Sequence, residues 1–387
     1  MAVAASAALC VVPAAAGATQ GQNGHRSFTM AVYGDSPYGL NNADTTQTEA
    51  TPAFIDTVNA DPAVSTVVHV GDIHSGKQIC SEAYDQQIAG FWTHFADPLV
   101  FTPGDNEWAD CHKVAEGGGK YNKVTGQIDF ASPSGYAQGD PIANLALVRS
   151  LFFPAPGQTL GSGTLSTVSQ ATAYDPAHPE DAQYVENVRW QRKGVVFVTL
   201  NLPGGSNNDN DIWYGTPTMS SAQQTEIQQR TAADLRWLDQ AFATAAAQDA
   251  QGVVVIEQSD LWDLDFGAKE HLTEDEPIVS SLATHTAAYG KPVLLLEGDS
   301  HIYRSDNPLQ QGAPCEGDVF PGTTTDVCSY DDWNTHPFYD VPNLHRVVVH
   351  GSTTPMEYLR LTVTPGGHAP ATSTTFGPFS WERVPVS

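Results

Sequence analysis

The sequence predicts an α/β fold in which short buried strands alternate with amphipathic helices. Six runs of β-branched and apolar residues support this prediction, because each run is short and ends in Gly, Asp or Asn. The runs cover residues 27–35, 65–72, 98–105, 194–201, 252–260 and 292–299. In such a layered fold, ligands bind at the carboxyl ends of the strands.

Two segments between these strands have helical periodicity. The apolar face of "EAYDQQIAGFWTHF" consists of Tyr84, Ile88, Phe91 and Phe95. The apolar face of "SAQQTEIQQRTAADLRWLDQAF" consists of Ile227, Leu235, Leu238 and Phe242. Ser221 is the expected N-cap of the second helix. The runs "NLHRVVVHGS", "EYLRLTVTP" and "FSWERV" predict further strands that complete the sheet system.

Residues 27–387 are expected to form a single domain. Within it, residues 112–190 interrupt the alternation of strands and helices. This stretch is rich in Gly, Pro and Ser, as in "SPSGYAQGDP" and "PAPGQTLGSGTLS". We expect a long insertion of loops that lies over the site as a rim, with a short helix near residues 142–152. A disordered linker is the alternative interpretation.

The composition limits the partners of this chain. It has 387 residues and a formal net charge of −27 at pH 7. Its 17 Lys and Arg residues form no basic run, so nucleic acid is not expected as a partner. After the N-terminal segment, no apolar run has the length of a membrane helix. The acidity is interpreted as a solubility feature of an extracellular or salty setting.

The first eighteen residues, "MAVAASAALCVVPAAAGA", carry no charge and end in Ala16-Gly17-Ala18. An apolar stretch followed by a small-x-small site is typical of a cleaved signal peptide, so we expect residues 1–18 to be removed. The mature protein would then be secreted or periplasmic. A structureless tail is the alternative, because the Lys or Arg that usually begins a signal peptide is missing.

Removal of the leader would take Cys10 with it and leave four cysteines. An even number of cysteines in an oxidising compartment favours two disulfides. Of the three possible connectivities we favour Cys80 with Cys111 and Cys315 with Cys328, because each pair brackets a loop-rich stretch. A zinc site is the rival, but the close Cys-x-x-Cys spacing that it needs is absent.

Four of the predicted strands end in Gly-Asp. The aspartates are Asp35, Asp72, Asp105 and Asp299. A single Gly-Asp after a strand is usually a turn, in which Asp accepts hydrogen bonds from nearby backbone N–H groups. Four of them at one edge of a sheet, the last with His301 two residues on, favour a cation site. A divalent metal is the simplest way to hold carboxylates that otherwise repel one another.

The order and spacing of these motifs resemble those of the calcineurin-like metallophosphoesterases, a family that includes the purple acid phosphatases. The resemblance covers roughly residues 27–365. It implies a four-layer α/β fold, a double β-sheet sandwich flanked by helices, with two metals about 3.5–4 Å apart. The stretches "TPGDNEWADC", "ENVRW", "GSNND" and "LLEGDSHIYRSDNPL" resemble more closely a secreted branch, with GDNEW and GDSH in place of GNHE and GHxH.

The resemblance also implies a set of metal ligands. The set is Asp72 shared by both metals, Asp35 and His301 on the first metal, and Asp105 and Asp299 on the second. Gln258, or Glu257 beside it, stands where the family has another His ligand. Because Pro37 also replaces a family histidine, a single imidazole remains and the site is rich in oxygen. We therefore expect one or two divalent ions, with Mn, Fe, Mg or Ca favoured over Zn.

The position of the family's leaving-group histidine is occupied by Asn106, which leaves general-acid assistance without an assigned residue. His74, just past Asp72, is the candidate for this role, and a solvated loop histidine is the alternative interpretation. The metals implied by the resemblance would lower the pKa of bound water from 15.7 towards about 7.

Two further residues are candidates for substrate binding. Asn207, in the polar run of residues 206–208 after a strand, could donate hydrogen bonds to the substrate, and a polar turn is the alternative. Arg304 could pair with a phosphate, and a structural pairing with Asp306 is the alternative.

The resemblance implies a secreted, metal-dependent phosphoesterase that hydrolyses phosphate mono- or diesters of small molecules. A second class stays open, namely an extracellular binding protein that keeps the fold and a cation but has lost the chemistry with its histidines. A serine hydrolase is a weaker idea, because no Gly-x-Ser-x-Gly motif is present.

Overall fold

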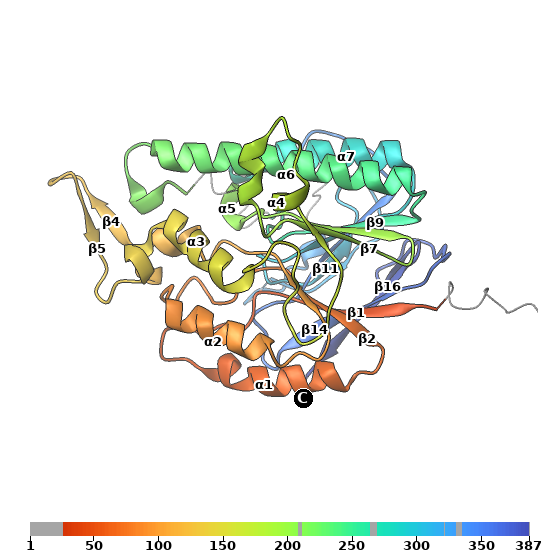
Figure 1. The fold of residues 1–387 in the computed structure, drawn as a ribbon, viewed down its shortest axis with the longest axis horizontal. Helices are drawn as coiled ribbons and strands as arrows, with labels where there is room; N and C mark the ends of the chain where they lie inside the picture. Colours follow the sequence, from red (N-terminus) through yellow and green to blue (C-terminus); the bar gives the residue numbers. More distant parts are fainter. Residues whose placement is uncertain (1–25, 208–210, 264–268, 321, 330–334, 387) are drawn as a thin grey trace, which may run out of the picture.

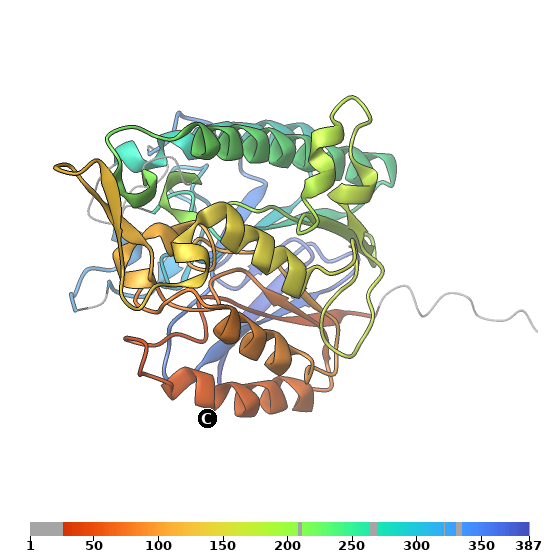
Figure 2. The same ribbon diagram turned by 60° about the vertical axis from the view of Figure 1, so that its left-hand side comes forward.

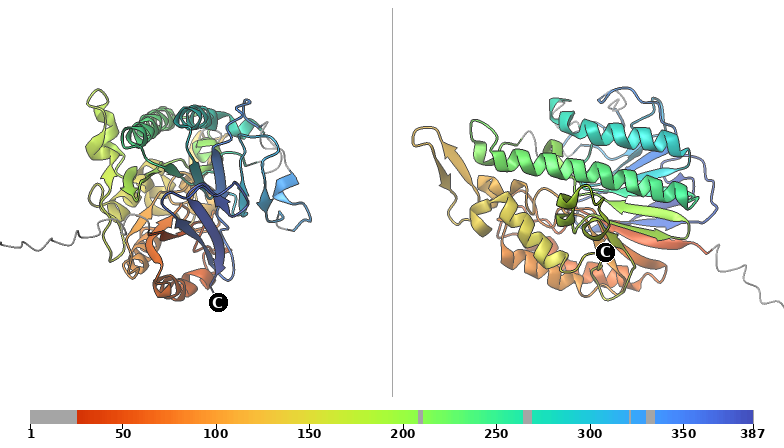
Figure 3. Two further views of the ribbon diagram at one scale, coloured as in Figure 1. Left: turned by 90° about the vertical axis from the view of Figure 1, so that its right-hand side faces the viewer. Right: turned by 45° about the horizontal axis from the view of Figure 1, so that its top comes forward.

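Two β-sheets packed face to face, with helices over their outer faces, make up the fold (Figure 1). The computed structural model describes residues 26–207, 211–263, 269–320, 322–329 and 335–386. The expected signal peptide and Cys10 lie outside the described residues. Viewed end-on, helices lie above and below the paired sheets, so the four-layer α/β arrangement is confirmed (Figure 3).

The first sheet has six strands. Their order is β15 (Thr375–Phe376), β16 (Phe379–Pro385), β14 (Glu357–Val363), β1 (Phe28–Tyr33), β2 (Val64–His69) and β3 (Leu99–Phe101). β1, β2 and β3 run parallel, whereas β14 pairs antiparallel with β1. The carboxyl ends of β1, β2 and β3 therefore share one edge of this sheet.

The second sheet has eight strands. Their order is β12 (Glu316–Gly317), β11 (Arg304–Asp306), β13 (Leu344–Val348), β10 (Val293–Glu297), β9 (Gly252–Ile256), β8 (Val195–Thr199), β7 (Val188–Arg192) and β6 (Val168–Ser169). β8, β9, β10 and β13 are parallel. The six strands predicted from apolar runs ending in Gly, Asp or Asn are β1, β2, β3, β8, β9 and β10.

The alternation of side chains in β1 explains the layering. Met30 and Val32 pack with Val254 and Leu296 of the second sheet in the core between the sheets. The intervening residue Ala31 packs on the outer side instead, with side chains of α1 (Thr46–Ala60) and α2 (Glu82–Trp92). A strand has a side-chain period of two, so one strand supplies both layers.

On the other outer face, α6 (Ser221–Ala247) and α7 (Glu276–Tyr289) cover the second sheet. Trp237 and Leu238 of α6 pack with Val198, a neighbour in the same buried cluster. The N-cap prediction was wrong by one residue. Ser220 has extended backbone and its side chain accepts a hydrogen bond from the N–H of Gln223, so it caps α6 in place of Ser221.

Residues 112–190 contain more regular structure than the expected loops. β4 (Gly119–Asn122) and β5 (Gln127–Phe130) form a hairpin that projects from the body (Figure 2). α3 (Pro141–Phe152) matches the predicted short helix, with Asp140 accepting a hydrogen bond from the N–H of Ala143. The segment then adds β6, α4 (Gln170–Ala173) and the start of β7, so it partly belongs to the second sheet.

Short helical turns connect the larger elements. They are α5 (Gly204–Asn207), η1 (Asp110–His112), η2 (Val114–Glu116), η3 (Tyr136–Gly139), η4 (Pro179–Gln183), η5 (Trp213–Gly215), η7 (Lys269–Asp275) and η8 (Val327–Ser329).

Two disulfides are present, joining Cys80 to Cys111 and Cys315 to Cys328, which is the pairing favoured from the sequence. Within the described ranges, no helix combines the length and the apolar character needed to cross a membrane.

Candidate metal centre

The carboxyl ends of the parallel strands from both sheets meet at one place. Asp35, Asp72 and Asp105 follow β1, β2 and β3 of the first sheet. Asp299 follows β10 of the second sheet, and its backbone N–H donates to Oδ1 of Asp35 at 2.9 Å. This contact joins the two sheets at the edge where the sequence predicted a cation site.

The backbone at these turns is unusual for residues with side chains. The φ angle is 50° at Asp35, 61° at Asp72, 64° at Asp299 and 63° at His301. A left-handed backbone is uncommon outside glycine and costs conformational energy, and such residues cluster at functional sites. The adjacent glycines leave room for the carboxylates, because a Cβ at Gly104 would collide with Oδ1 of Asp72.

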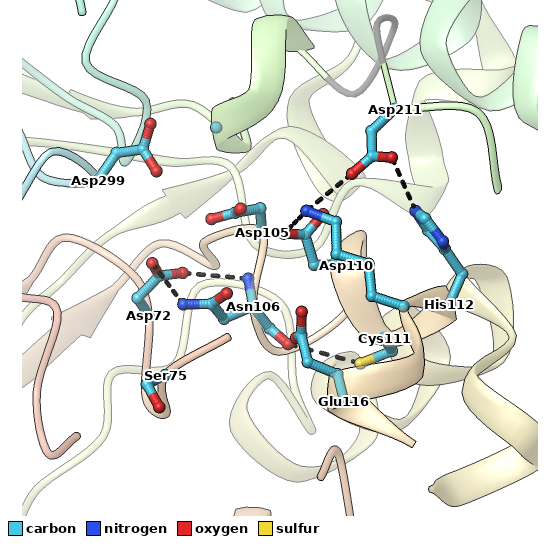
Figure 4. Close-up of polar contacts among 12 residues, drawn as sticks. Asp72, Ser75, Asp105, Asn106, Asp110, Cys111, His112, Glu116, Asp211 and Asp299 are labelled. Carbon is cyan, nitrogen blue, oxygen red and sulfur yellow. Dashed lines mark hydrogen bonds and ion pairs between the residues drawn. The ribbon is translucent and has the colours of Figure 1, made fainter. Parts of the chain in front are cut away.

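Two groups of potential ligands share one aspartate. In the first group, ligand atoms of Asp35, Asp72 and His301 lie within 4.8 Å of one another. In the second group, ligand atoms of Asp72, Asp105 and Asp299 lie within the same distance. Figure 4 shows Asp72, Asp105 and Asp299 converging from separate loops. The geometry thus places Asp72 where a ligand shared by two ions would lie.

The charge and burial of the two groups test whether a cation fits. Asp35 and Asp72 are 0% and 1% exposed, and Oδ2 of Asp35 has no hydrogen-bond partner among the described residues. Burial raises the pKa of both carboxyls well above the usual range, and the charge of Asp105 raises it further. In the part of the chain that the structure describes, neither Lys nor Arg pairs with Asp35, Asp72 or Asp299. Carboxylate oxygens with these properties fit a hard divalent cation.

Gln258 lies at the second group, but it presents its amide nitrogen to the carboxylates, whereas a metal ligand would present its oxygen. The backbone N–H of Gly204 donates to Oε1 of Gln258 at 2.7 Å. Nε2 therefore faces three carboxylates, at 3.2 Å from Asp72, 2.9 Å from Asp105 and 3.0 Å from Asp299. Because a backbone N–H can only donate, the observed orientation makes Gln258 a donor to the carboxylates. Its predicted role as a ligand would require the amide to rotate.

Glu257, the alternative to Gln258, lies in the interior with Glu297 as its neighbour. Burial, followed by the charge of Glu297, raises its pKa well above the usual range. It belongs to neither ligand group.

Tyr38 is a site residue that sequence reasoning missed. Its hydroxyl donates to Oδ2 of Asp72 at 2.7 Å and accepts from Nδ2 of Asn106 at 3.0 Å. Its ring packs edge-on against the imidazole of His301, with 5.0 Å between ring centroids. The sequence feature that could have indicated Tyr38 is its place in "GDSPY", three residues after Asp35 on the same turn.

Asn106 lies against the shared aspartate, as its place in the third motif implies. Its backbone N–H donates to Oδ1 of Asp72 at 3.2 Å, and its Nδ2 donates to Oδ2 at 3.0 Å. Together with Tyr38, it fixes the orientation of the Asp72 carboxylate.

Two buried residues that sequence analysis did not single out hold the ligand loops in place. Nδ1 of His69 accepts the N–H of Gly71 at 3.2 Å, so its Nε2 carries the proton and donates to the carbonyl of Ser36 at 2.9 Å. Burial lowers the pKa of His69 to about 4, which keeps it neutral in this role. Oε1 of Glu107 accepts the N–H of Gly104 at 2.6 Å, which anchors the loop after β3.

Of the three remaining candidate residues, one is buried and neutral and the other two are hydrogen-bonded elsewhere. His74 is 1% exposed, which corrects the solvated alternative, and burial lowers its pKa to about 4, which leaves it a poor proton donor at neutral pH. Asn207 is 1% exposed, and its amide is bound by Arg230 and Thr231 at α6, so its side chain is not available to a substrate. Arg304 donates to Asp306 at 2.7 Å, which is the structural pairing considered as the alternative.

A third group, beside the first two, is an ion-pair cluster. Asp110, His112 and Asp211 bring ligand atoms within 4.8 Å of one another (Figure 4). The ammonium of Lys113 already pairs with Asp110, and with Asp211 at 2.7 Å. Nδ1 of His112 accepts the N–H of Tyr214, so the neutral ring carries its proton on Nε2, the atom that faces Asp211. A cation would have to displace both the ammonium and this proton.

The comparisons with known proteins give likenesses of structure alone. The sequence matches no known family profile and no curated protein. The fold is similar to that of a purple acid phosphatase from yellow lupin (Lupinus luteus) seeds, at 12% identity over 87% of this chain and 49% of the other, with a TM-score of 0.40. It is also similar to PhoD, at 13% identity over 88% of this chain and 64% of the other, with a TM-score of 0.43. The chain thus spans less than two thirds of the length of either structure.

Proposed function

We propose that this chain is a secreted, metal-dependent phosphoesterase that hydrolyses mono- or diesters of phosphate. The observation that carries the proposal is the position of Asp72, a buried carboxylate that belongs to two ligand groups at once. These groups come from the strand-end motifs on which the resemblance to the metallophosphoesterases rests.

In this proposal Asp35 and His301 hold one ion, Asp105 and Asp299 hold the other, and Asp72 contributes to both. A bound divalent cation would supply a Lewis acid that lowers the pKa of water and neutralises charge on phosphoryl oxygens. The oxygen-rich ligand set favours Mn, Fe, Mg or Ca over Zn.

The residues around Asp72 have positioning roles in the same proposal. Tyr38 and Asn106 both donate to Oδ2 of Asp72, which leaves its oxygens in one fixed orientation. A carboxylate that is fixed in this way reduces the reorganisation that binding requires. Gln258 holds Asp105 and Asp299 near each other through its amide nitrogen, and a cation in the second group would displace these hydrogen bonds.

The weakest part of this chemistry is protonation of the leaving group. His74 is buried and neutral, and Asn106 has an amide that does not transfer protons. This observation favours, as a second candidate function, a metal-binding extracellular protein of the same fold that has lost catalysis. Esters with good leaving groups, such as nitrophenyl phosphates, need little protonation and are therefore the most informative substrates.

The test combines metal content with turnover. The purified protein would be stripped of metal, reloaded with Mn²⁺, Fe²⁺, Mg²⁺, Ca²⁺ or Zn²⁺, and assayed on p-nitrophenyl phosphate and bis-p-nitrophenyl phosphate. Metal-dependent turnover that Asp72→Asn abolishes and the exposed control Asp56→Asn retains would support the phosphoesterase. Bound metal without turnover of either ester would favour the binding protein, and no bound metal would reject both.

Secretion is part of the proposal and has its own support. The apolar leader of residues 1–18 and the two disulfides both fit an oxidising compartment. N-terminal sequencing of protein recovered outside the cytoplasm tests it, with cleavage after Ala18 as the expected result.

A further inference from the structure

A pocket of about 500 Å³ opens beside the candidate metal centre. Part of its wall is formed by His301, a member of the first ligand group, and by Tyr38, which donates to Asp72 of that group. The loop that precedes α1 and the loop that follows β2 form other parts, through Leu40 and Lys77. Its volume lies within the range of small-molecule sites, so a molecule held by the metals could extend into it.

Lys77 places a positive charge in the wall of this pocket, and Asp44, whose pKa is lowered by hydrogen bonds from Leu40 and Thr46, places a negative charge in the same wall. Lys77 is exposed on the loop after β2, and no acidic side chain among the described residues pairs with its ammonium. The one acid in the wall, Asp44, is engaged by its own loop, because its carboxylate accepts from the N–H of Leu40 at 2.8 Å and from the hydroxyl of Thr46 at 2.7 Å. In a chain with a net charge of −27, an unpaired cation beside an acidic site is notable.

The same wall also offers apolar surface. Leu40 is 74% exposed, which is more than any other large hydrophobic residue near this pocket. Exposed leucine next to an unpaired ammonium forms a surface for an organic group that carries an anion.

We propose that this pocket binds the leaving group of the substrate, and that Lys77 pairs with a second anionic group on it. The preferred substrates are then organic phosphoesters with another carboxylate or phosphate a few bonds away from the ester. This inference rests on the proposed phosphoesterase function, which places the phosphate itself on the ions.

Two non-hydrolysable ligands separate this inference from turnover. Phenylphosphonate carries the phosphoryl group and the ring, and 4-carboxyphenylphosphonate adds one carboxylate. Isothermal titration of the Mn²⁺-loaded protein measures the Kd of each. In the unmodified protein the carboxylated ligand should bind about three- to fivefold more tightly, which is the upper range for an ion pair with an exposed ammonium.

Lys77→Met should remove that difference and leave the Kd of phenylphosphonate within about twofold, since only the carboxylate meets the ammonium. Lys77→Glu should reverse the preference. The control, Lys120→Met, removes an exposed lysine from the β4–β5 hairpin and should leave both Kd values unchanged. Leu40→Ser should weaken both ligands equally, because both carry the ring.

Equal affinity of the unmodified protein for the two ligands, or equal weakening of both by Lys77→Met, would overturn the role of Lys77. If nitrophenyl phosphates are still hydrolysed in that case, the phosphoesterase function stands and only the assignment of this pocket fails. If neither phosphonate binds and no ester is hydrolysed, both proposals fail together.

Discussion

Gln258 is the residue at which this site departs most clearly from a set of metal ligands. Its oxygen is held by the N–H of Gly204 and its nitrogen donates to the carboxylates of the second group. These hydrogen bonds occupy oxygen lone pairs that a cation in the second group would use. Outside the aspartate that they share, the two ligand groups differ, because Gln258 donates to Asp105 and Asp299 of the second group but to neither Asp35 nor His301 of the first.

Changing Gln258 to His should strengthen the second group for zinc, because imidazole offers a lone pair where the amide offers a donor. We expect the Kd of the weaker Zn²⁺ site to fall by at least about tenfold. Calorimetric titration measures it. Gln258→Leu is the control, since it removes the amide without supplying a nitrogen ligand, and equal zinc affinity of the two variants would contradict the argument.

His69 should matter to metal binding although it contacts no ligand atom. His69→Phe keeps the ring packing against Tyr33 and Trp92 but loses both hydrogen bonds to the ligand loops. We expect metal affinity to fall about tenfold, with a loss of about 1–3 kcal/mol in the free energy of unfolding for the unpaired buried groups. His345→Phe, at a buried histidine of β13, is the control that should lose stability and keep metal affinity. Equal metal affinities of the two variants would refute the positioning role.

At the scale of elements, the Cys80–Cys111 disulfide closes the stretch between the loops that carry Asp72 and Asp105. Its ends are 31 residues apart in the sequence, so its removal should cost about 3–4 kcal/mol by the chain-entropy estimate. Replacing both cysteines with serine should also weaken metal binding, because two ligand loops lose a common anchor. Urea unfolding and metal titration of the same variant measure the two effects.

The Cys315–Cys328 disulfide is the matched comparison. Its ends are 13 residues apart, and its removal should cost about 3 kcal/mol without changing metal affinity. The same loss of metal affinity in both double variants would show that general loosening is responsible.

The strand ends were predictable from the sequence, whereas several side-chain roles were not. An apolar run followed by Gly-Asp marks both a strand and the carboxylate after it, so Asp35, Asp72 and Asp105 could be placed at one edge of a sheet. Asp299 was expected at the same edge, but it follows β10 of the second sheet and meets the others across the two sheets. Gln258 could not be oriented, because its partner Gly204 precedes it by 54 residues along the chain. The partners of Asn207 could not be foreseen for the same reason, since Arg230 and Thr231 approach it only after α6 folds back.

The loop-rich segment shows a different limit. Its Gly, Pro and Ser content predicted loops, so the β4–β5 hairpin, whose strands are four residues each, was not predicted. Short strands with exposed side chains have little apolar pattern to detect, whereas α3 was found because its apolar face is buried.

At the scale of the whole molecule, buried neutral histidines should make the fold sensitive to acid. Burial lowers the pKa of His345 to about 4 in the folded protein, whereas the unfolded chain binds a proton near its ordinary value of 6.5. The contribution of neutral His345 to the free energy of unfolding is therefore complete above pH 6.5, and it is lost as the pH falls towards 4. Between pH 7 and pH 5 the unmodified protein should lose about 2 kcal/mol more stability than His345→Gln. Urea unfolding at both pH values tests this, with the exposed His94→Gln as the control, and identical pH slopes for wild type and His345→Gln would contradict it.

The central claim is that Asp72 is shared by two cation sites, and the most direct test is the metal content of Asp72→Asn. Elemental analysis and Mn²⁺ titration would be run on wild type, Asp72→Asn and the exposed control Asp56→Asn, together with melting of the metal-free proteins. We expect Asp72→Asn to retain no ion after desalting, because the charged ligand shared by both groups is lost. The metal-free variant should stay folded with a somewhat lower melting temperature, because both oxygens of Asp72 accept hydrogen bonds and an amide nitrogen cannot. If Asp72→Asn keeps the full metal content of wild type, Asp72 is not a shared ligand and the account of this site is wrong.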